Sequence, residues 1–171
     1  MSVAHDAATE SATWTTTPDP FTFSHTPSGT PKGVLVCIFI NAATTDEIDG
    51  TVSYGGVAMT RVDMAADTSG EPGRSWIYFL GSGVPPGTQT VSIAHTATGN
   101  TKIATCITLT AAAHLAVAAS NKIQTDQADP QIALDSGARD ALRYCVIFSG
   151  LNAPGDLTPL TSPAHTAVSD H

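Results

Sequence analysis

The sequence has few charged residues: Asp, Glu, Lys and Arg make up 13% of its 171 residues, roughly half of the usual share of about 25%. Seven basic residues stand against 15 acidic ones, which gives a net charge of −8 and a pI near 4.9. Binding to nucleic acid requires clustered Lys and Arg, and an acidic surface is repelled by anionic membranes. We therefore expect neither a nucleic acid nor a membrane among the partners.

Long apolar runs and a secretion signal are also missing. No run in the sequence approaches the roughly 20 residues that span a bilayer. Residues 1–6 lack the basic and apolar regions of a signal peptide. We expect the protein to remain in the compartment where it is made, at least until something assembles around it.

Cysteine is scarce as well. The three cysteines, Cys37, Cys106 and Cys145, each lie inside an apolar run. An odd count without CxxC spacing argues against a disulfide framework and against a zinc knuckle. We predict three buried thiols that act as small apolar side chains in a reducing compartment.

The clearest positive pattern is one β-hairpin over residues 51–62, with Gly55-Gly56 as its tight turn. Adjacent glycines suit such a turn because they adopt positive φ without a Cβ clash. After the turn, the alternation predicts a single strand with two faces. One face would carry Val57, Met59 and Arg61, and the other Ala58, Thr60 and Val62.

The rest of the chain repeats this pattern, with short apolar or alternating runs between turn residues. These predicted strands cover residues 21–25, 34–40, 74–80, 88–95, 102–110, 131–135 and 142–148. We extend the prediction to the stretch 111–119 because of its position between strands, although its alanines also favour a helix. About eight to ten short strands at this spacing predict an all-β fold, an antiparallel β-sandwich of jelly-roll or immunoglobulin-like type. Hydrophobic residues, 42% of the chain, are enough to fill its core.

We predict two parts in the chain. Residues 1–20 form an extended N-terminal arm or an edge strand, because Pro18 and Pro20 cannot donate to a sheet. Residues 21–171 form a single β-sandwich domain with a Pro-rich C-terminal tail. Trp14 in the arm is the better candidate to contact a partner, whereas Trp76 lies in a core-like strand.

The histidines and acidic loops offer only weak metal-binding patterns. No two of the six histidines have the spacing of a local ligand pair. His25 and His95 fall in predicted strands, where we expect half-exposed side chains, with a metal site assembled through folding as the alternative. Two predicted loops could supply oxygen ligands to Ca²⁺, but neither has EF-hand spacing, so we expect solvated loop tips. The first loop carries Asp46, Glu47 and Asp49, and the second carries Asp63, Asp67 and Glu71.

Motifs for catalysis are absent. Gly81-Ser82-Gly83 precedes prolines rather than a helix, so it is not a phosphate-binding loop. Ser149-Gly150 follows a predicted strand, but Pro154 and Gly155 exclude the helix that a nucleophile elbow needs. We therefore predict no catalytic residue, no cofactor and no metal. The alternative is a hydrolase that uses loop carboxylates.

The hairpin resembles a motif in a family of phage and prophage proteins, with the approximate pattern Val-x-Tyr-Gly/Asn-Gly-Val-Ala-Met/Leu-Thr. Here it is Val52-Ser53-Tyr54-Gly55-Gly56-Val57-Ala58-Met59-Thr60. Further matches follow the same order: residues 21–26, the strand with Trp76 and Tyr78, and residues 85–91. The similarity covers about residues 1–110.

The resemblance implies a jelly-roll or immunoglobulin-like sandwich carried on virions as head decoration, fibre or tail-associated part. It implies no catalytic residues. We expect a capsid decoration protein that binds the outer capsid surface as a homo-oligomer, through sandwich edges and the N-terminal arm. Its expected partners are the major capsid protein or other virion subunits. Similar proteins continue with further strands, so either the strands above close this fold or a neighbouring subunit supplies an edge. The alternative is a fibre or tail module that binds host-surface glycans.

Overall fold

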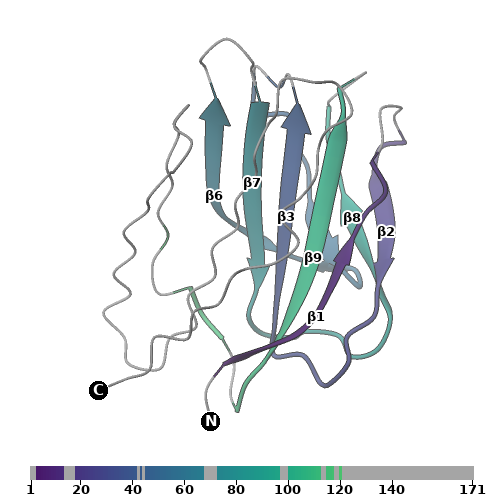
Figure 1. Cartoon of the computed structure of the whole chain (residues 1–171), viewed down its shortest axis with the longest axis vertical. Coiled ribbons are helices and arrows are strands. Elements are labelled where there is room, and N and C mark those ends of the chain that lie inside the picture. The colour runs from purple at the N-terminus through teal and green to yellow at the C-terminus, as the bar shows by residue number, and fades with distance from the viewer. Residues whose placement is uncertain are drawn as a thin grey trace.

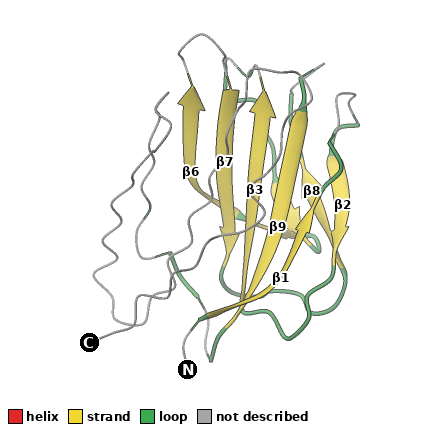
Figure 2. Ribbon diagram, in the orientation of Figure 1, coloured by secondary structure: helices red, strands yellow, loops and turns green. Residues whose placement is uncertain are grey.

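The computed structural model describes residues 3–13, 18–41, 43, 45–67, 73–96, 100–112, 115–117 and 120. Over this part of the chain there are nine strands and no helix (Figures 1 and 2). The strands are β1 (Ala4–Glu10), β2 (Phe21–His25), β3 (Gly33–Asn41), β4 (Val52–Tyr54), β5 (Val57–Ala58), β6 (Thr60–Asp67), β7 (Gly73–Leu80), β8 (Gln89–Ile93) and β9 (Lys102–Thr110). The predicted all-β class is confirmed. It follows that none of the described residues belongs to a helix able to cross a membrane.

The strands form two antiparallel sheets. One has five strands in the order β1-β9-β3-β7-β6, and the other has four in the order β2-β8-β4-β5. In Figure 1 the five-stranded sheet faces the viewer, and β2 and β8 lie behind it. The predicted β-sandwich is therefore confirmed.

The pairing of the strands is nested. Among the described strands, the first pairs with the last (β1 with β9), the second with the last but one (β2 with β8), and β3 pairs with β7. Such nesting arises when one long antiparallel ribbon rolls up, and it is the order of a jelly roll. An immunoglobulin-like sandwich would instead pair the first strand with the second in one sheet. The structure thus decides between the two predicted types.

The main core lies between the sheets. Along β3, Val34, Val36, Ile38 and Ile40 are completely buried, as is Trp76 on β7. Such a side chain contributes about 1.5–3 kcal/mol when buried. From the four-stranded sheet, the core receives Val52, Tyr54, Val91 and Ile93. This matches the prediction that Trp76 is a core residue.

A second apolar cluster covers the outer face of the five-stranded sheet. Leu35, Ile107 and Leu109 form it, and Leu115 packs against them. Leu115 comes close to the sheet because two glycines leave room: a Cβ on Gly81 would lie 1.9 Å from the Leu115 carbonyl oxygen, and one on Gly33 would lie 2.7 Å from its Cδ1. Neither 111–112 nor 115–117 is in a strand. The strand predicted over 111–119 is therefore wrong for these residues.

The glycine turn is confirmed, but the strand after it is not continuous. Gly55 and Gly56 have φ of 56° and 79°, and they connect β4 to β5 with Tyr54 opposite Val57. The chain then leaves this sheet at Met59, whose amide still donates to the Val52 carbonyl at 2.8 Å. From Thr60 onward it pairs with β7 in the other sheet. The prediction of one hairpin over 51–62 is therefore corrected: its second strand passes from one sheet to the other.

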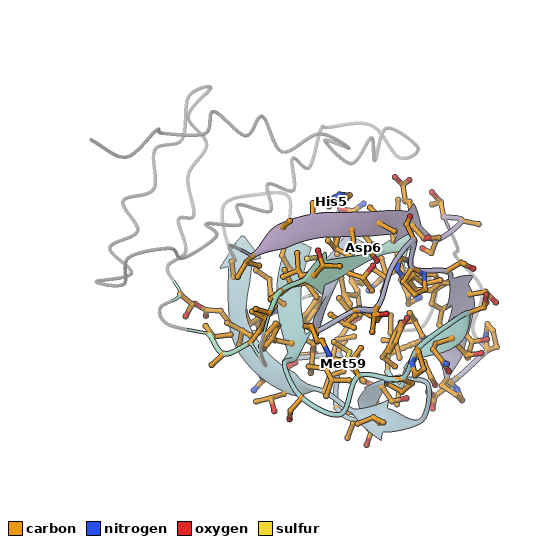
Figure 3. The ribbon with its side chains drawn as sticks, turned by 90° about the horizontal axis from the view of Figure 1, so that it is seen from below. His5, Asp6 and Met59 are labelled. Carbon is orange, nitrogen blue, oxygen red and sulfur yellow. The ribbon has the colours of Figure 1, made fainter. Side chains whose placement is uncertain are left out.

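The N-terminal segment contributes an edge strand, β1, which pairs with β9. Figure 3 views the sandwich end-on, with His5 and Asp6 on β1 along one side and Met59 toward the other. The predicted strands over 131–135 and 142–148, the Pro-rich tail, Trp14 and Cys145 lie outside the described residues.

Candidate functional site

The first acidic loop is held by the core rather than open to a ligand. Asp46 Oδ1 accepts a hydrogen bond from Trp76 Nε1 at 2.9 Å, and Oδ2 accepts one from Arg61 Nη1 at 2.5 Å. Burial by itself would raise the pKa of Asp46, but the hydrogen bonds from Arg61 and Trp76 outweigh it and lower this pKa. Asp46 therefore acts as a charged link between the loop, β6 and β7.

Glu47 fastens the same loop to the chain on the other side. Its backbone carbonyl accepts from the Thr96 amide at 2.9 Å, and its carboxylate accepts from Asn100 Nδ2 at 3.4 Å. The Asn100 carbonyl in turn accepts from Nζ of the fully buried Lys102 at 2.8 Å. Burial lowers the pKa of Lys102, and the charge of Glu47 opposes this shift. The carboxylates of Asp46 and Glu47 thus have structural partners, while Asp49 is exposed.

The second acidic loop is shorter than predicted. Asp63 and Asp67 belong to β6, and the register of β6 against β7 shifts between Arg61 and Asp63. Glu71 lies outside the described residues. Within the described part of the chain, no three His, Cys, Asp or Glu side chains form a group that could hold a metal ion.

His25 is a buried connector between three strands. Its Nδ1 lies 2.8 Å from Thr9 Oγ1 on β1, and its Nε2 lies 3.1 Å from Thr108 Oγ1 on β9. Thr108 donates its hydroxyl proton to Asp6 Oδ2 at 2.9 Å, so it must accept from His25. His25 is therefore the Nε2–H tautomer, and its Nδ1 accepts from Thr9.

Asp6 occupies a bulge of β1, where the register shifts between His5 and Ala7. Because one extra residue turns the strand at a bulge, the Asp6 carboxylate reaches both Thr108 and the Ser28 amide, the latter at 3.2 Å. Burial lowers the pKa of His25, and the Asp6 carboxylate acts in the opposite direction. We call Asp6, Thr9, His25 and Thr108 the β1 clasp.

The two strand histidines are more buried than predicted. His25 and His95 are both almost fully buried, not half-exposed. His95 follows β8, and its amide donates to Asp19 Oδ1 at 3.1 Å. The alternative was a metal site at these histidines, but among the described residues neither histidine belongs to a group of side chains that could hold a metal ion. His5 is exposed on β1, and the remaining histidines lie outside the described residues.

Cys37 and Cys106 are free and buried, as predicted. Burial raises the pKa of the Cys37 thiol to about 12 and raises that of Cys106 as well. Neither thiol is therefore a nucleophile at neutral pH.

A shallow groove of about 420 Å³ lies beside the ends of β6 and β7. Its wall is formed by 115–117, which reach this place because the Leu115 amide donates to the Gly81 carbonyl at 3.1 Å. Val117 is 45% exposed. The lining residues are Thr60, Arg61, Val62, Phe79, Gly81, Ser82, Leu115, Ala116, Val117 and Ser120. Sequence reasoning missed this groove, since the only local signal was the glycine pair around Ser82.

No family model matches the chain, and no curated protein or solved structure gives a significant match to it. The resemblance of residues 52–60 to phage proteins therefore stays a prediction from the sequence.

Proposed function

We propose that this protein is a non-enzymatic structural protein of a virion, a capsid decoration protein that binds the outer capsid surface. Two observations support the proposal. The hairpin at Gly55-Gly56 resembles a motif of phage proteins, and the nested strand order is that of a jelly roll, an architecture used by viral capsid and lectin domains. The second observation is an analogy at the level of the fold.

The observation that carries the proposal is the structural role of the hairpin motif. Tyr54 is completely buried between the sheets, and the glycines that follow form the turn between β4 and β5. The motif therefore specifies a sandwich and leaves the outer surfaces to make contacts. No catalytic or binding role of the hairpin is needed to explain these residues.

We assign capsid contact to the groove beside β6 and β7. Exposed Val117 and partly buried Leu115 provide apolar surface next to the backbone of Gly81 and Ser82. A groove whose lining combines apolar side chains with polar and backbone groups suits an apolar side chain on an extended segment. The occupant we propose is such a segment of a capsid subunit.

The test mixes the purified protein with capsids that lack it, taken from the phage or prophage that encodes it, followed by sedimentation and imaging. We expect regular decoration, and Val117→Asp should weaken it by at least about tenfold because a buried charge is costly at an interface. Thr22→Asp is the matched control, since Thr22 is exposed on the other sheet. If the wild-type protein leaves every such capsid bare, the proposal is wrong.

A glycan-binding fibre module is the alternative. It predicts exposed aromatic side chains for sugar stacking, whereas each aromatic residue of the described part is buried or partly buried: Phe21, Phe23, Phe39, Tyr54, Trp76, Tyr78 and Phe79. Specific binding on a glycan array, with no binding to capsids, would favour this alternative over the decoration protein.

A further inference from the structure

Strand β1 differs from the strands around it in what it buries. Its sequence, AHDAATE, contains no aliphatic side chain larger than Ala, whereas β9 beside it carries Ile103, Ile107 and Leu109 in buried positions. Apart from the small Ala7, the half-buried side chains of β1 are those of Asp6 and Thr9, which are polar. Val3, just before the strand, adds a partly buried apolar contact to the outer cluster of Leu35, Ile107 and Leu109. The hydrophobic effect therefore holds β1 only weakly.

Polar contacts hold β1 in its place. Its backbone pairs with β9 over six residue pairs. The β1 clasp adds the bonds from Thr9 to His25 and from Thr108 to Asp6. Just after the strand, the Ser11 amide donates to the Ala104 carbonyl at 2.8 Å, and Ser11 Oγ accepts from the Ala104 amide at 3.0 Å. Water can replace hydrogen bonds of this kind at a small net change in free energy.

The position of β1 also favours its release. It is the outermost strand of the five-stranded sheet on the β9 side, so within the described part of the chain its departure breaks one ladder only. Ten residues, 11–20, separate it from β2. Edge strands with few buried apolar contacts open at lower free energy than the rest of a domain.

We propose that β1 is an exchangeable strand, which leaves its own β9 and pairs with β9 of a second copy of this chain. The second copy offers the same partners, namely the β9 backbone, His25 and Thr108, so every bond of the β1 clasp is formed again between the two chains. Ser11 would likewise bond to Ala104 of the second copy, so the change of path is confined to the connection between Ser11 and β2. Reciprocal exchange of this kind gives a closed dimer. The inference does not depend on the proposed capsid function.

One residue pair makes the exchange measurable. Because the Ser11 amide bonds to the Ala104 carbonyl, the next pair along the ladder, Glu10 and Thr105, is a non-hydrogen-bonded pair. Its Cα atoms are expected about 4.5 Å apart, which lies within the range of about 4.4–6.8 Å that a disulfide spans. Glu10 is exposed and Thr105 is half-buried, so cysteines at these positions leave the main core intact.

The experiment mixes two single variants, Glu10→Cys and Thr105→Cys, both with Cys145→Ser and one with a tag of different mass. Neither chain can close this disulfide alone. After incubation at high protein concentration and mild oxidation, we expect a disulfide-linked heterodimer on a non-reducing gel. Its yield should exceed that of the control pair Glu10→Cys with Thr22→Cys by at least about tenfold, because strand pairing raises the effective concentration of the two thiols.

The double variant Glu10→Cys/Thr105→Cys tests the same geometry within one chain. At low concentration it should close its disulfide internally and afterwards remain a monomer by size-exclusion chromatography with light scattering, since β1 is then locked. The proposal is overturned if the double variant closes but the mixed single variants give no more heterodimer than the control pair. It is also overturned if the double variant does not close, because β1 would then not lie on β9 in this register.

Discussion

Trp76 and Asp46 are joined across the surface of the sandwich by a hydrogen bond of 2.9 Å from the indole Nε1 to the carboxylate Oδ1. The indole is completely buried, whereas the side chain of Asp46 is 41% exposed. The bond therefore satisfies the one polar atom of a large core residue at the edge of the core. The Asp46 carboxylate, which the sequence offered as a possible Ca²⁺ ligand, therefore has a structural role.

Substitutions of Asp46 should separate this hydrogen bond from the ion pair with Arg61. Asp46→Ala leaves the buried indole N–H without an acceptor, and we expect it to lower the free energy of unfolding by about 1–3 kcal/mol. Asp46→Asn keeps an acceptor oxygen and should cost less than about 1 kcal/mol. Arg61→Gln should cost an intermediate amount, because it removes an exposed ion pair, which contributes about 0–1 kcal/mol, and also the partner of the Tyr78 hydroxyl. Urea denaturation of the three variants would show the order, and equal losses for Ala and Asn would contradict it.

His25 should make the stability of the protein depend on pH. Burial lowers the pKa of His25 in the folded state, while the unfolded chain binds the proton near the ordinary pKa of about 6.5. The unfolded state therefore holds more protons as the pH falls below this value, and the free energy of unfolding decreases, by at most about 1.4 kcal/mol per pH unit for one proton. The decrease should end once the pH is below the lowered folded pKa.

The matched control for this measurement is His25→Gln. Its amide can donate to Thr108 and accept from Thr9, as the neutral imidazole does, but it does not titrate. Urea denaturation between pH 8 and pH 5 should show a smaller decrease in stability for the variant than for the wild type. Parallel curves for the two proteins would show that His25 does not set the pH dependence.

The Tyr54 hydroxyl should be dispensable for folding. It is buried, it has no hydrogen-bond partner among the described residues, and burial raises the pKa of Tyr54 to about 12. Tyr54→Phe removes an unsatisfied polar atom and keeps the ring, so we expect a free energy of unfolding that is unchanged or higher by up to about 1 kcal/mol. Tyr78→Phe is the control, because Tyr78 interacts with Arg61 through its hydroxyl, and its loss should cost about 0.5–1.5 kcal/mol. A larger loss for Tyr54→Phe would contradict the assignment.

The two glycines of the hairpin turn should differ in their tolerance of a side chain. Both have positive φ, where Ala is disfavoured by about 1–2 kcal/mol. A Cβ on Gly55 would also lie 2.5 Å from Gln89 Oε1, whereas nothing lies within 4 Å of one on Gly56. We therefore expect Gly55→Ala to lower the melting temperature more than Gly56→Ala, and Gly56→Asn to be the mildest because Asn tolerates this conformation. The reverse order would contradict the turn geometry.

Sequence patterns located most of the strands because a strand is a local feature. Alternation and apolar runs marked β2, β3, β4, β7, β8 and β9 to within a few residues, and Gly55-Gly56 identified the turn. β1 was harder to place because its Ala and Thr residues show no apolar alternation. The break at Met59 was missed because the alternation continues across it in the sequence while the chain changes sheets.

The candidate sites were less predictable than the strands. The sequence indicated that Trp76 and two cysteines are buried, since each stands in an apolar run. It could not show that Asp46 is bound to Trp76 and Arg61, which are 30 and 15 residues away. Nor could it show that Asp6 and Thr108, separated by 102 residues, meet at His25.

By itself, then, the sequence determined the all-β class, the Gly55-Gly56 turn and the residue types of the core, because side-chain alternation and φ preferences act between neighbours in the chain. Only the tertiary structure decided the jelly-roll order, the sheet change at Met59 and the β1 clasp. These features depend on which distant strands pair. Backbone hydrogen bonds are the same for every pair of strands. Which strands pair is therefore determined by side-chain packing and by the few buried polar side chains that need hydrogen-bond partners.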